Sequence, residues 1–239
     1  MSSKRSSFPL FPPWWRASLA SGFFVTGTDT GVGKTVVSAA LTIALRHAGP
    51  VRYWKPIQTG IEHDDDTATV ASLAACAASE LLTTGVRLPR PLSPHLAARL
   101  SGTAIELGPL EDAFTEAARS SRLVVEGAGG ALVPVNDIQM MTDLMARLDL
   151  PVVIAARSTL GTINHTLLTI EALRHRSISI AGVVMVGPPN ADNREAIERY
   201  GDVKVAGEMP MFAPLTHEQL STWVALEFDR DRHLRGQVQ

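Results

Sequence analysis

Apolar and polar positions along the chain fall into two alternating patterns. Short apolar runs, typical of buried strands, alternate with longer segments in which apolar residues recur at helical spacing. The apolar runs predict strands at residues 23–25, 51–54, 122–125, 151–155, 180–186 and 203–206. The helical spacing predicts helices at residues 34–47, 66–80, 110–118, 140–148, 163–175 and 191–200. Because strands that alternate with helices build parallel sheets, we expect an α/β fold: a mostly parallel sheet with helices on both faces.

The first 22 residues follow neither pattern. They include three prolines and two adjacent tryptophans, without helical or strand spacing. Lys4 and Arg5 precede apolar residues, as in an export signal, but the prolines interrupt the apolar run and a core strand follows at once. We therefore expect residues 1–22 to form a disordered or loosely docked extension, and residues 23–239 to form a single domain.

Composition narrows the range of partners. The chain has 239 residues, a formal charge of −2 and one cysteine, Cys76. Without a long basic run, neither nucleic acid nor an anionic membrane is an expected partner. No apolar run approaches the roughly 18 residues that a membrane helix needs. The lone cysteine excludes an internal disulfide framework and fits a reducing cytoplasm, which is the compartment we expect.

A glycine-rich segment, GTDTGVGKT at residues 27–35, lies between the first predicted strand and the first predicted helix. Glycines allow the backbone to curl so that successive N–H groups point at one anion, and the helix N-terminus adds a partial positive charge. This segment predicts a P-loop that binds a nucleoside triphosphate, with Lys34 at the β- and γ-phosphates and the Thr35 hydroxyl on Mg²⁺. Five residues, instead of the usual four, separate Gly27 from Gly33.

Charged residues follow two other predicted strands and open one predicted helix. Lys55 follows the second strand, where it would suit a substrate anion or a transferring phosphoryl group, although a solvated surface lysine is the alternative. Asp64, Asp65 and Asp66 lie at a helix start. At least two of them are expected to cap the helix, and a third to point at Mg²⁺. Glu126 ends an apolar strand, as a second Mg²⁺ ligand would, with a plain strand-to-loop turn as the alternative.

Several motifs occur together in the order typical of one family. They are GTDTGVGKT at 27–35, KPIQTG at 55–60, SPH at 93–95, EGAGG at 126–130 and LGTINH at 160–165, with a weaker match, GEMP, at 207–210. Together they resemble the dethiobiotin synthetase family over residues 23–212. The five-residue spacing in the P-loop is itself a trait of that family, so it supports the resemblance.

The resemblance implies a P-loop NTPase-type fold and a ligase activity, the penultimate step of biotin biosynthesis. The family joins CO₂ to 7,8-diaminononanoate with ATP and Mg²⁺, and it releases dethiobiotin, ADP and phosphate. The reaction runs through a carbamate and a carbamic–phosphoric anhydride. Catalysis should therefore depend on positioning and electrostatics, without a covalent nucleophile from the protein.

The resemblance also assigns roles to residues. By similarity, Lys34 and Lys55 would stabilise carbamate and phosphoryl oxygens. The nucleotide would contact Thr28, Asp29, Gly31, Val32, Gly33, Lys34, Thr35 and Pro210. The substrate would contact Thr30, Thr59 and Gly129. Mg²⁺ would be held by Thr35, Asp66 and Glu126.

The segment before the helix predicted at 163–175 indicates a homodimer. In the family the corresponding turn binds the substrate carboxylate of the neighbouring subunit, and a helix N-terminus suits a carboxylate. The residues implied in this contact are Leu160, Gly161, Thr162 and Asn164. The resemblance therefore implies a homodimer with shared active sites.

One stretch departs from the family pattern. The family often has an Asn after the sixth strand, within a pattern like Ala-Asn-Asp, that reads the adenine edge. The corresponding residues here are Met185, Val186 and Gly187, which offer no side-chain amide. The nucleotide preference is therefore left open, with backbone groups as a looser means of selection.

Three other interpretations conflict with particular residues. A partition-type ATPase would carry an extra lysine where this chain has Asp29. A cobyrinate-type amidating synthetase would need a glutaminase domain with a nucleophilic cysteine, whereas Cys76 lies in an alanine-rich segment. A stand-alone regulatory domain would be expected to lack the KPIQTG and LGTINH motifs. The histidines show no metal-ligand spacing, so they support no other metal chemistry.

Overall fold

The computed structural model describes residues 22–237. The extension predicted for residues 1–22 thus lies outside the described residues, apart from Gly22, which is already part of the first strand. The first strand, predicted at residues 23–25, extends from Gly22 to Gly27. Among the helices of the described range, none combines the length and apolar character that crossing a membrane requires.

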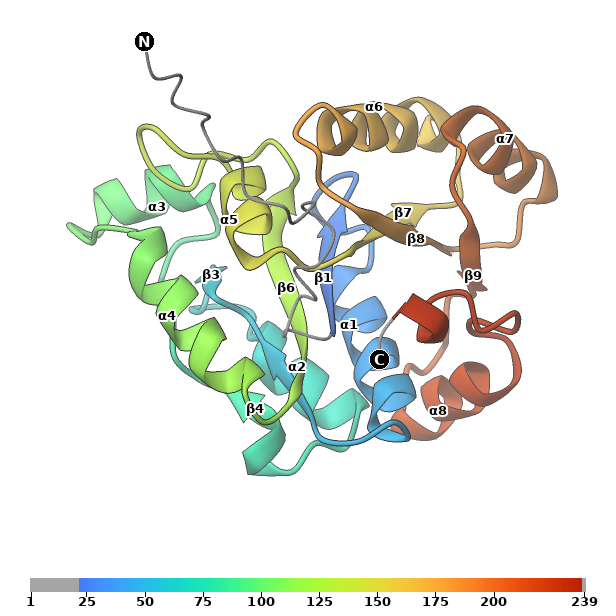
Figure 1. Cartoon of the computed structure of the whole chain (residues 1–239), viewed down its shortest axis with the longest axis horizontal. Coiled ribbons are helices and arrows are strands. Elements are labelled where there is room, and N and C mark those ends of the chain that lie inside the picture. Colours follow the sequence, from blue (N-terminus) through green and yellow to red (C-terminus); the bar gives the residue numbers. More distant parts are fainter. Residues whose placement is uncertain (1–21, 238–239) are drawn as a thin grey trace, which may run out of the picture.

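A seven-stranded sheet forms the centre of the molecule (Figure 1). Its order is β4-β2-β6-β1-β7-β8-β9, and every neighbouring pair is parallel. The strands are β1 (Gly22–Gly27), β2 (Val51–Trp54), β4 (Leu81–Leu82), β6 (Arg122–Gly130), β7 (Val152–Arg157), β8 (Ile180–Val186) and β9 (Val205–Met209). A separate parallel pair joins β3 (Ile57–Thr59) to β5 (Val86–Leu88). The predicted sheet is confirmed.

Helices cover both faces of this sheet, as a parallel sheet requires because both of its faces are apolar. One face packs against α1 (Lys34–Arg46), α2 (Asp66–Leu73) and α8 (His217–Leu226). The other packs against α3 (Pro94–Leu100), α4 (Leu107–Ala118), α5 (Met141–Leu148), α6 (Thr162–Arg174) and α7 (Ala191–Gly201). Adjacent residues of β1 divide between the two cores, since Phe23 packs on the α1 side and Phe24 on the α5 side.

The helix predicted at 66–80 is too long and is corrected by the structure. α2 ends at Leu73, and Ala75 adopts a left-handed φ of 48°. The N–H groups of Ala75 and Cys76 then return to the carbonyls of Ser72 and Ala71, which is a Schellman ending. A short 3₁₀ helix at Ala78–Glu80 follows. Alanine content favoured a longer helix, but it carried no signal for this stop.

Candidate functional site

The P-loop connects the carboxyl end of β1, the central strand, to α1. Gly33 precedes the helix with φ 96°, a left-handed conformation that suits glycine. The Thr28 N–H donates to the Ala155 carbonyl at 3.0 Å, which ties the loop to β7. Lys34 folds back over the loop, and its Nζ donates to the Asp29 carbonyl at 3.0 Å.

Strand periodicity directs the key side chains of β2 and β6 to one face. Tyr53 pairs with Val124 in the sheet, and both pack in the core on the α1 side. Side chains two residues apart on a strand share a face, so Lys55 follows Tyr53 and Glu126 follows Val124 toward α1. Thr35, in the first turn of α1, meets them there.

Two carboxylates, a hydroxyl and an ammonium converge at this point. The Thr35 hydroxyl lies 2.8 Å from Asp66 Oδ1 and 3.1 Å from Glu126 Oε1. Lys55 Nζ lies 2.7 Å from Asp66 Oδ2 and 2.8 Å from Glu126 Oε1. The Tyr53 hydroxyl donates to the other oxygen of Glu126, Oε2, at 2.9 Å. Sequence analysis missed Tyr53, although its spacing of two from Lys55 was a usable signal.

Burial and charge oppose each other at Lys55 and Asp66 and act together at Lys34 and Tyr53. Burial disfavours the Lys55 ammonium, but Glu126 and Asp66 outweigh it and raise the pKa of Lys55. Burial likewise disfavours the Asp66 carboxylate, yet Lys55 outweighs it and lowers the pKa of Asp66. Burial, followed by the charge of Lys55, lowers the pKa of Lys34. Burial and the Glu126 charge raise the pKa of Tyr53 well above its ordinary value, so its hydroxyl stays a donor.

The donor set fits a hard cation such as Mg²⁺, which prefers oxygen ligands. Asp66 and Glu126 already share one cation, the Lys55 ammonium, and the Thr35 hydroxyl adjoins both carboxylates. Between residues 22 and 237, no group of three or more His, Cys, Asp or Glu side chains could hold a metal. A metal here would therefore depend on two carboxylates and one hydroxyl.

The three consecutive aspartates divide their roles differently from the prediction. Only Asp65 caps α2, by accepting from the N–H groups of Thr67 and Ala68 at 2.9 and 3.1 Å. The expectation that at least two of the aspartates are caps was wrong. Asp66 is the first residue of the helix, and its carboxylate turns toward Thr35 and away from the helix end.

A cavity of about 780 Å³ adjoins this cluster at the carboxyl edge of the sheet. Its lining includes these predicted site residues: Thr30, Gly31, Gly33, Lys34, Thr35, Lys55, Thr59, Asp66, Glu126 and Gly129. The structure therefore brings together the residues predicted for phosphate, metal and substrate. Ser93 and Pro94 line the same cavity, and the SPH motif was the signal for them.

A second cavity, of about 470 Å³, begins on the other side of Gly31 and Gly33. It has a mainly apolar lining, contributed by Val32, Val36, Val186, Gly187, Pro188, Met209, Pro210, Met211, Phe212 and Leu215. Arg157 lies at this cavity and pairs with Asp29 at 3.0 Å. Sequence analysis missed Arg157, and nothing in its local sequence indicated this pairing.

The residues predicted to serve a neighbouring subunit line neither cavity, although the preceding Thr159 lines the second one. Leu160 is fully exposed, and Gly161 precedes α6 with φ 92°. Thr162 and Asn164 belong to the first turn of that helix. Their use by a second subunit stays a prediction.

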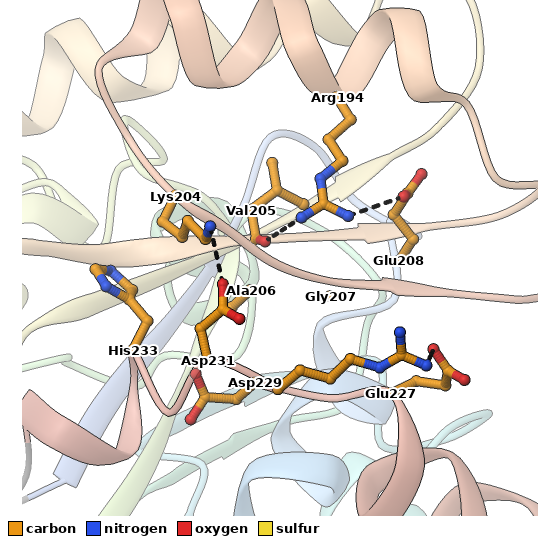
Figure 2. Close-up of a pocket in the computed structure, with 11 residues that line it drawn as sticks. Arg194, Lys204, Val205, Ala206, Gly207, Glu208, Glu227, Asp229, Asp231 and His233 are labelled. Atoms are coloured by element: carbon orange, nitrogen blue, oxygen red, sulfur yellow. Dashed lines mark hydrogen bonds and ion pairs between the residues drawn. The ribbon is translucent and has the colours of Figure 1, made fainter.

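A charged notch of about 210 Å³ lies along the edge strand β9, away from the P-loop (Figure 2). Its charges neutralise one another: Lys204 pairs with Asp231 at 3.0 Å, and Arg194 with Glu208 at 3.3 Å. The buried Asp229 pairs with Arg235 at 3.1 Å. Because these cations already have carboxylate partners, the notch does not compete with the P-loop cavity as an anion site.

Known proteins resemble this chain over most of its length. The family model described as an AAA domain matches residues 21–219. An ATP-dependent dethiobiotin synthetase BioD from Nitrobacter hamburgensis is 45% identical over 218 residues, which are 91% of this chain and 99% of that protein. The chain belongs to the ATP-dependent dethiobiotin synthetase family. The family resemblance of the motifs is thereby confirmed.

Other relatives include both a stand-alone dethiobiotin synthetase and a longer, bifunctional protein. A BioD from Paramagnetospirillum magneticum is 51% identical over 82% of this chain and 90% of that protein. The biotin biosynthesis bifunctional protein BioCD of Bordetella avium is 48% identical over 84% of this chain, which spans only 42% of that protein. As a dethiobiotin synthetase family member, the chain is a ligase with a role in biotin biosynthesis.

The fold also occurs outside the dethiobiotin synthetase family. A ParA family ATPase from Chlorobium tepidum TLS superposes with a TM-score of 0.56, covering 87% of this chain and 99% of that chain. The identity is 12%, so this likeness shows the P-loop NTPase fold alone. It confirms the predicted fold class and does not revive the partition-type interpretation.

Proposed function

We propose that this protein closes the ureido ring of dethiobiotin from 7,8-diaminononanoate and CO₂, with ATP and Mg²⁺. One observation carries the proposal. In a chain of the dethiobiotin synthetase family, Lys34, Lys55, Thr35, Asp66 and Glu126 surround one cavity at the carboxyl edge of the sheet. Both lysine ammonium groups and the three oxygen ligands proposed for Mg²⁺ would then face the same reacting group.

The proposed chemistry has three balanced steps. One amine nitrogen attacks the carbon of CO₂, which forms a carbamate and releases a proton. A carbamate oxygen attacks the γ-phosphorus of ATP, so that ADP leaves and a carbamic–phosphoric anhydride forms. The second amine attacks the carbamoyl carbon, the C–O bond to phosphate breaks, and inorganic phosphate and a proton leave. ATP is needed because a carbamate alone has no good leaving group.

The residues would act through position and charge. Lys34 and Lys55 would stabilise the carbamate and phosphoryl oxygens as negative charge shifts between them. Thr30, Thr59 and Gly129 would hold the reacting end of the diamine. Thr35, Asp66 and Glu126 would hold Mg²⁺, which when bound supplies positive charge to the triphosphate.

The nucleotide base would occupy the apolar cavity beside the P-loop. Val186 and Pro210 line this cavity, and no side-chain amide stands at residues 185–187. ATP is the proposed nucleotide because the relatives are named ATP-dependent. An apolar lining holds any base by packing, so we expect modest discrimination against CTP and GTP.

A homodimer with shared active sites is part of the proposal. The exposed side chains of Leu132 and Leu168 line a depression of about 370 Å³ beside Thr30 of the P-loop. Leu160 stands fully exposed just before α6. These apolar side chains would pack against a second copy and bring its α6 N-terminus to the substrate carboxylate. The cytoplasm stays the predicted compartment.

A product assay tests the proposal. Purified protein is incubated with 7,8-diaminononanoate, bicarbonate and Mg²⁺, and with ATP, CTP or GTP in separate reactions. We expect dethiobiotin and phosphate in equal amounts, with ATP at least as effective as the others. A Lys34→Met variant is the control, because it keeps the length of the side chain and loses the charge.

The outcomes separate the reaction from the nucleotide preference. Phosphate without dethiobiotin, or no turnover with any triphosphate, would contradict the proposed reaction. A clear preference for another triphosphate would contradict only the choice of ATP.

A further inference from the structure

Glu126 is fully buried, and its two carboxylate oxygens have different surroundings. Oε1 faces the Thr35 hydroxyl at 3.1 Å and the Lys55 ammonium at 2.8 Å. Oε2 accepts a hydrogen bond from the Tyr53 hydroxyl at 2.9 Å. The oxygen directed at the P-loop is thus Oε1, and the one directed into the sheet is Oε2.

Tyr53 is held in place by its own packing. It lies in the middle of β2, pairs with Val124 of β6, and is fully buried in the core shared with α1. A fully packed ring on an inner strand, between β4 and β6, has little freedom to move its hydroxyl. The hydrogen bond to Oε2 therefore fixes the orientation of the Glu126 carboxylate and does not merely follow it.

We propose that Tyr53 is a positioning residue that makes Glu126 a single-oxygen metal ligand. With Oε2 retained by Tyr53, only Oε1 is presented beside Thr35. This inference rests on the proposed Mg²⁺ site.

The consequence is selectivity between cations. Mg²⁺ takes six ligands in a tight octahedron, whereas Ca²⁺ readily takes both oxygens of one carboxylate and more ligands in total. A carboxylate restricted to one oxygen therefore favours Mg²⁺. Release of Oε2 would make the site more tolerant of Ca²⁺.

Tyr53→Phe tests this role, since it removes the hydroxyl and keeps the buried ring. The chain has one other tyrosine, Tyr200, which is exposed on α7, so Tyr200→Phe is the matched control. Binding of Mn²⁺ to the nucleotide-free protein is followed by electron paramagnetic resonance, with Mg²⁺ and Ca²⁺ as competitors. The Mg²⁺ dependence of dethiobiotin formation is measured in parallel.

We expect Tyr53→Phe to weaken Mg²⁺ binding about 10-fold, the usual effect of losing a partner of a metal ligand. Ca²⁺ binding should hold or improve, so the Ca²⁺/Mg²⁺ affinity ratio should rise by about the same factor. In the activity assay, half-maximal dethiobiotin formation should need about 10-fold more Mg²⁺ in Tyr53→Phe than in the wild type. A purely structural defect would weaken both cations alike and leave the ratio unchanged, which would overturn the proposal.

Two further comparisons keep the result interpretable. If Tyr53→Phe does not fold, the wild type decides: equal competition by Mg²⁺ and Ca²⁺ would overturn the single-oxygen ligand. If the wild type binds no Mn²⁺ that Mg²⁺ displaces and forms dethiobiotin without Mg²⁺, the proposed metal site itself fails. If the wild type binds Mg²⁺ and Tyr53→Phe has the same Ca²⁺/Mg²⁺ affinity ratio, the metal site stands and only the role of Tyr53 is contradicted.

Discussion

At the scale of single residues, Lys55 has two roles that oppose each other. Its ammonium is buried between Asp66 and Glu126, the two carboxylates proposed to hold Mg²⁺. The same ammonium is proposed to stabilise the reacting oxygens. The Lys55 ammonium between the two carboxylates would repel Mg²⁺ at the same place. Binding of the metal should therefore be coupled to movement of Lys55 toward the substrate.

Lys55→Met should therefore change stability as well as activity. Loss of the ammonium leaves the buried Glu126 and the half-buried Asp66 without their counter-charge, which should lower the free energy of unfolding without metal by about 3 kcal/mol. Mg²⁺ should restore more stability to this variant than to the wild type. Urea unfolding with and without Mg²⁺ measures both effects.

Lys204→Met is the control for this substitution, because Lys204 forms its ion pair with the exposed Asp231 far from the P-loop. Ring closure should fall at least about 100-fold in Lys55→Met and remain normal in the control. Equal metal-free stability in the wild type and Lys55→Met would contradict the buried counter-charge.

At the scale of elements, sequence patterns predicted long strands and helices well and short or irregular ones poorly. The strand at 51–54 and that at 180–186 have the predicted bounds, because both are mainly apolar, as buried parallel strands are. The helices α3 and α8 and the strands β3 to β5 were missed. Segments of two to seven residues show no clear period, which accounts for α3 and the three strands but not for the ten residues of α8. The early end of α2 was missed because an alanine occupies the position where glycine is the usual signal.

Ala75→Gly should stabilise the protein. Ala75 holds a left-handed φ of 48°, which costs a residue with a Cβ about 1 kcal/mol and glycine little. After allowance for the greater freedom of glycine in the unfolded chain, we expect a gain of about 0.5 kcal/mol in the free energy of unfolding. Ala71→Gly, inside α2, should lose about 1 kcal/mol in the same urea titrations. If both variants lost the same free energy of unfolding, the proposed strain at Ala75 would be contradicted.

Glu80→Gln should weaken a clamp between α1 and the segment after α2. Arg46 donates to both oxygens of Glu80, at 2.8 and 3.0 Å, and this pairing lowers the pKa of Glu80. A lowered pKa stabilises the fold above the unfolded value of about 4.3, and that stability is lost as the pH falls through the folded value. The free energy of unfolding of the wild type should therefore exceed that of the variant by about 1 kcal/mol at pH 7. The difference should shrink as the pH falls below the unfolded value and disappear below the lowered, folded pKa of Glu80. Thermal unfolding across this range would show a constant difference if the pair did not matter.

At the scale of the whole molecule, the central position of β1 organises the functional regions. The P-loop leaves the middle of the sheet, so its glycines border both the 780 Å³ cavity and the 470 Å³ cavity. The motifs predicted many of the residues that line the first cavity, because strand ends and helix starts meet at that edge of the sheet. Tyr53 was missed, although its spacing of two from Lys55 places both side chains on one face. Arg157 could not be predicted, since its partner Asp29 is distant in sequence and adjacent only after folding.

Leu168→Asp should dissociate the proposed dimer. A carboxylate on the exposed face of α6 would be buried without a counter-charge if that face packs against a second copy. Leu226→Asp, at the exposed end of α8, places the same charge outside the proposed interface. Sedimentation should show a monomer only for the α6 variant. Identical oligomeric states in the wild type and both variants would place the interface elsewhere.

The backbone at Gly187 restricts how base preference in this protein could be altered, by selection or by design. Gly187 has a φ of 134°, and a Cβ there would lie 2.4 Å from the buried Ser158 Oγ. Any side chain at 187 would strain the backbone and collide with Ser158, so only glycine is expected to be tolerated at this position. Val186 lines the cavity proposed for the base from a regular strand and is free of that constraint. Of the two adjacent positions, residue 186 is therefore the one at which a polar group facing this cavity could arise by a single substitution.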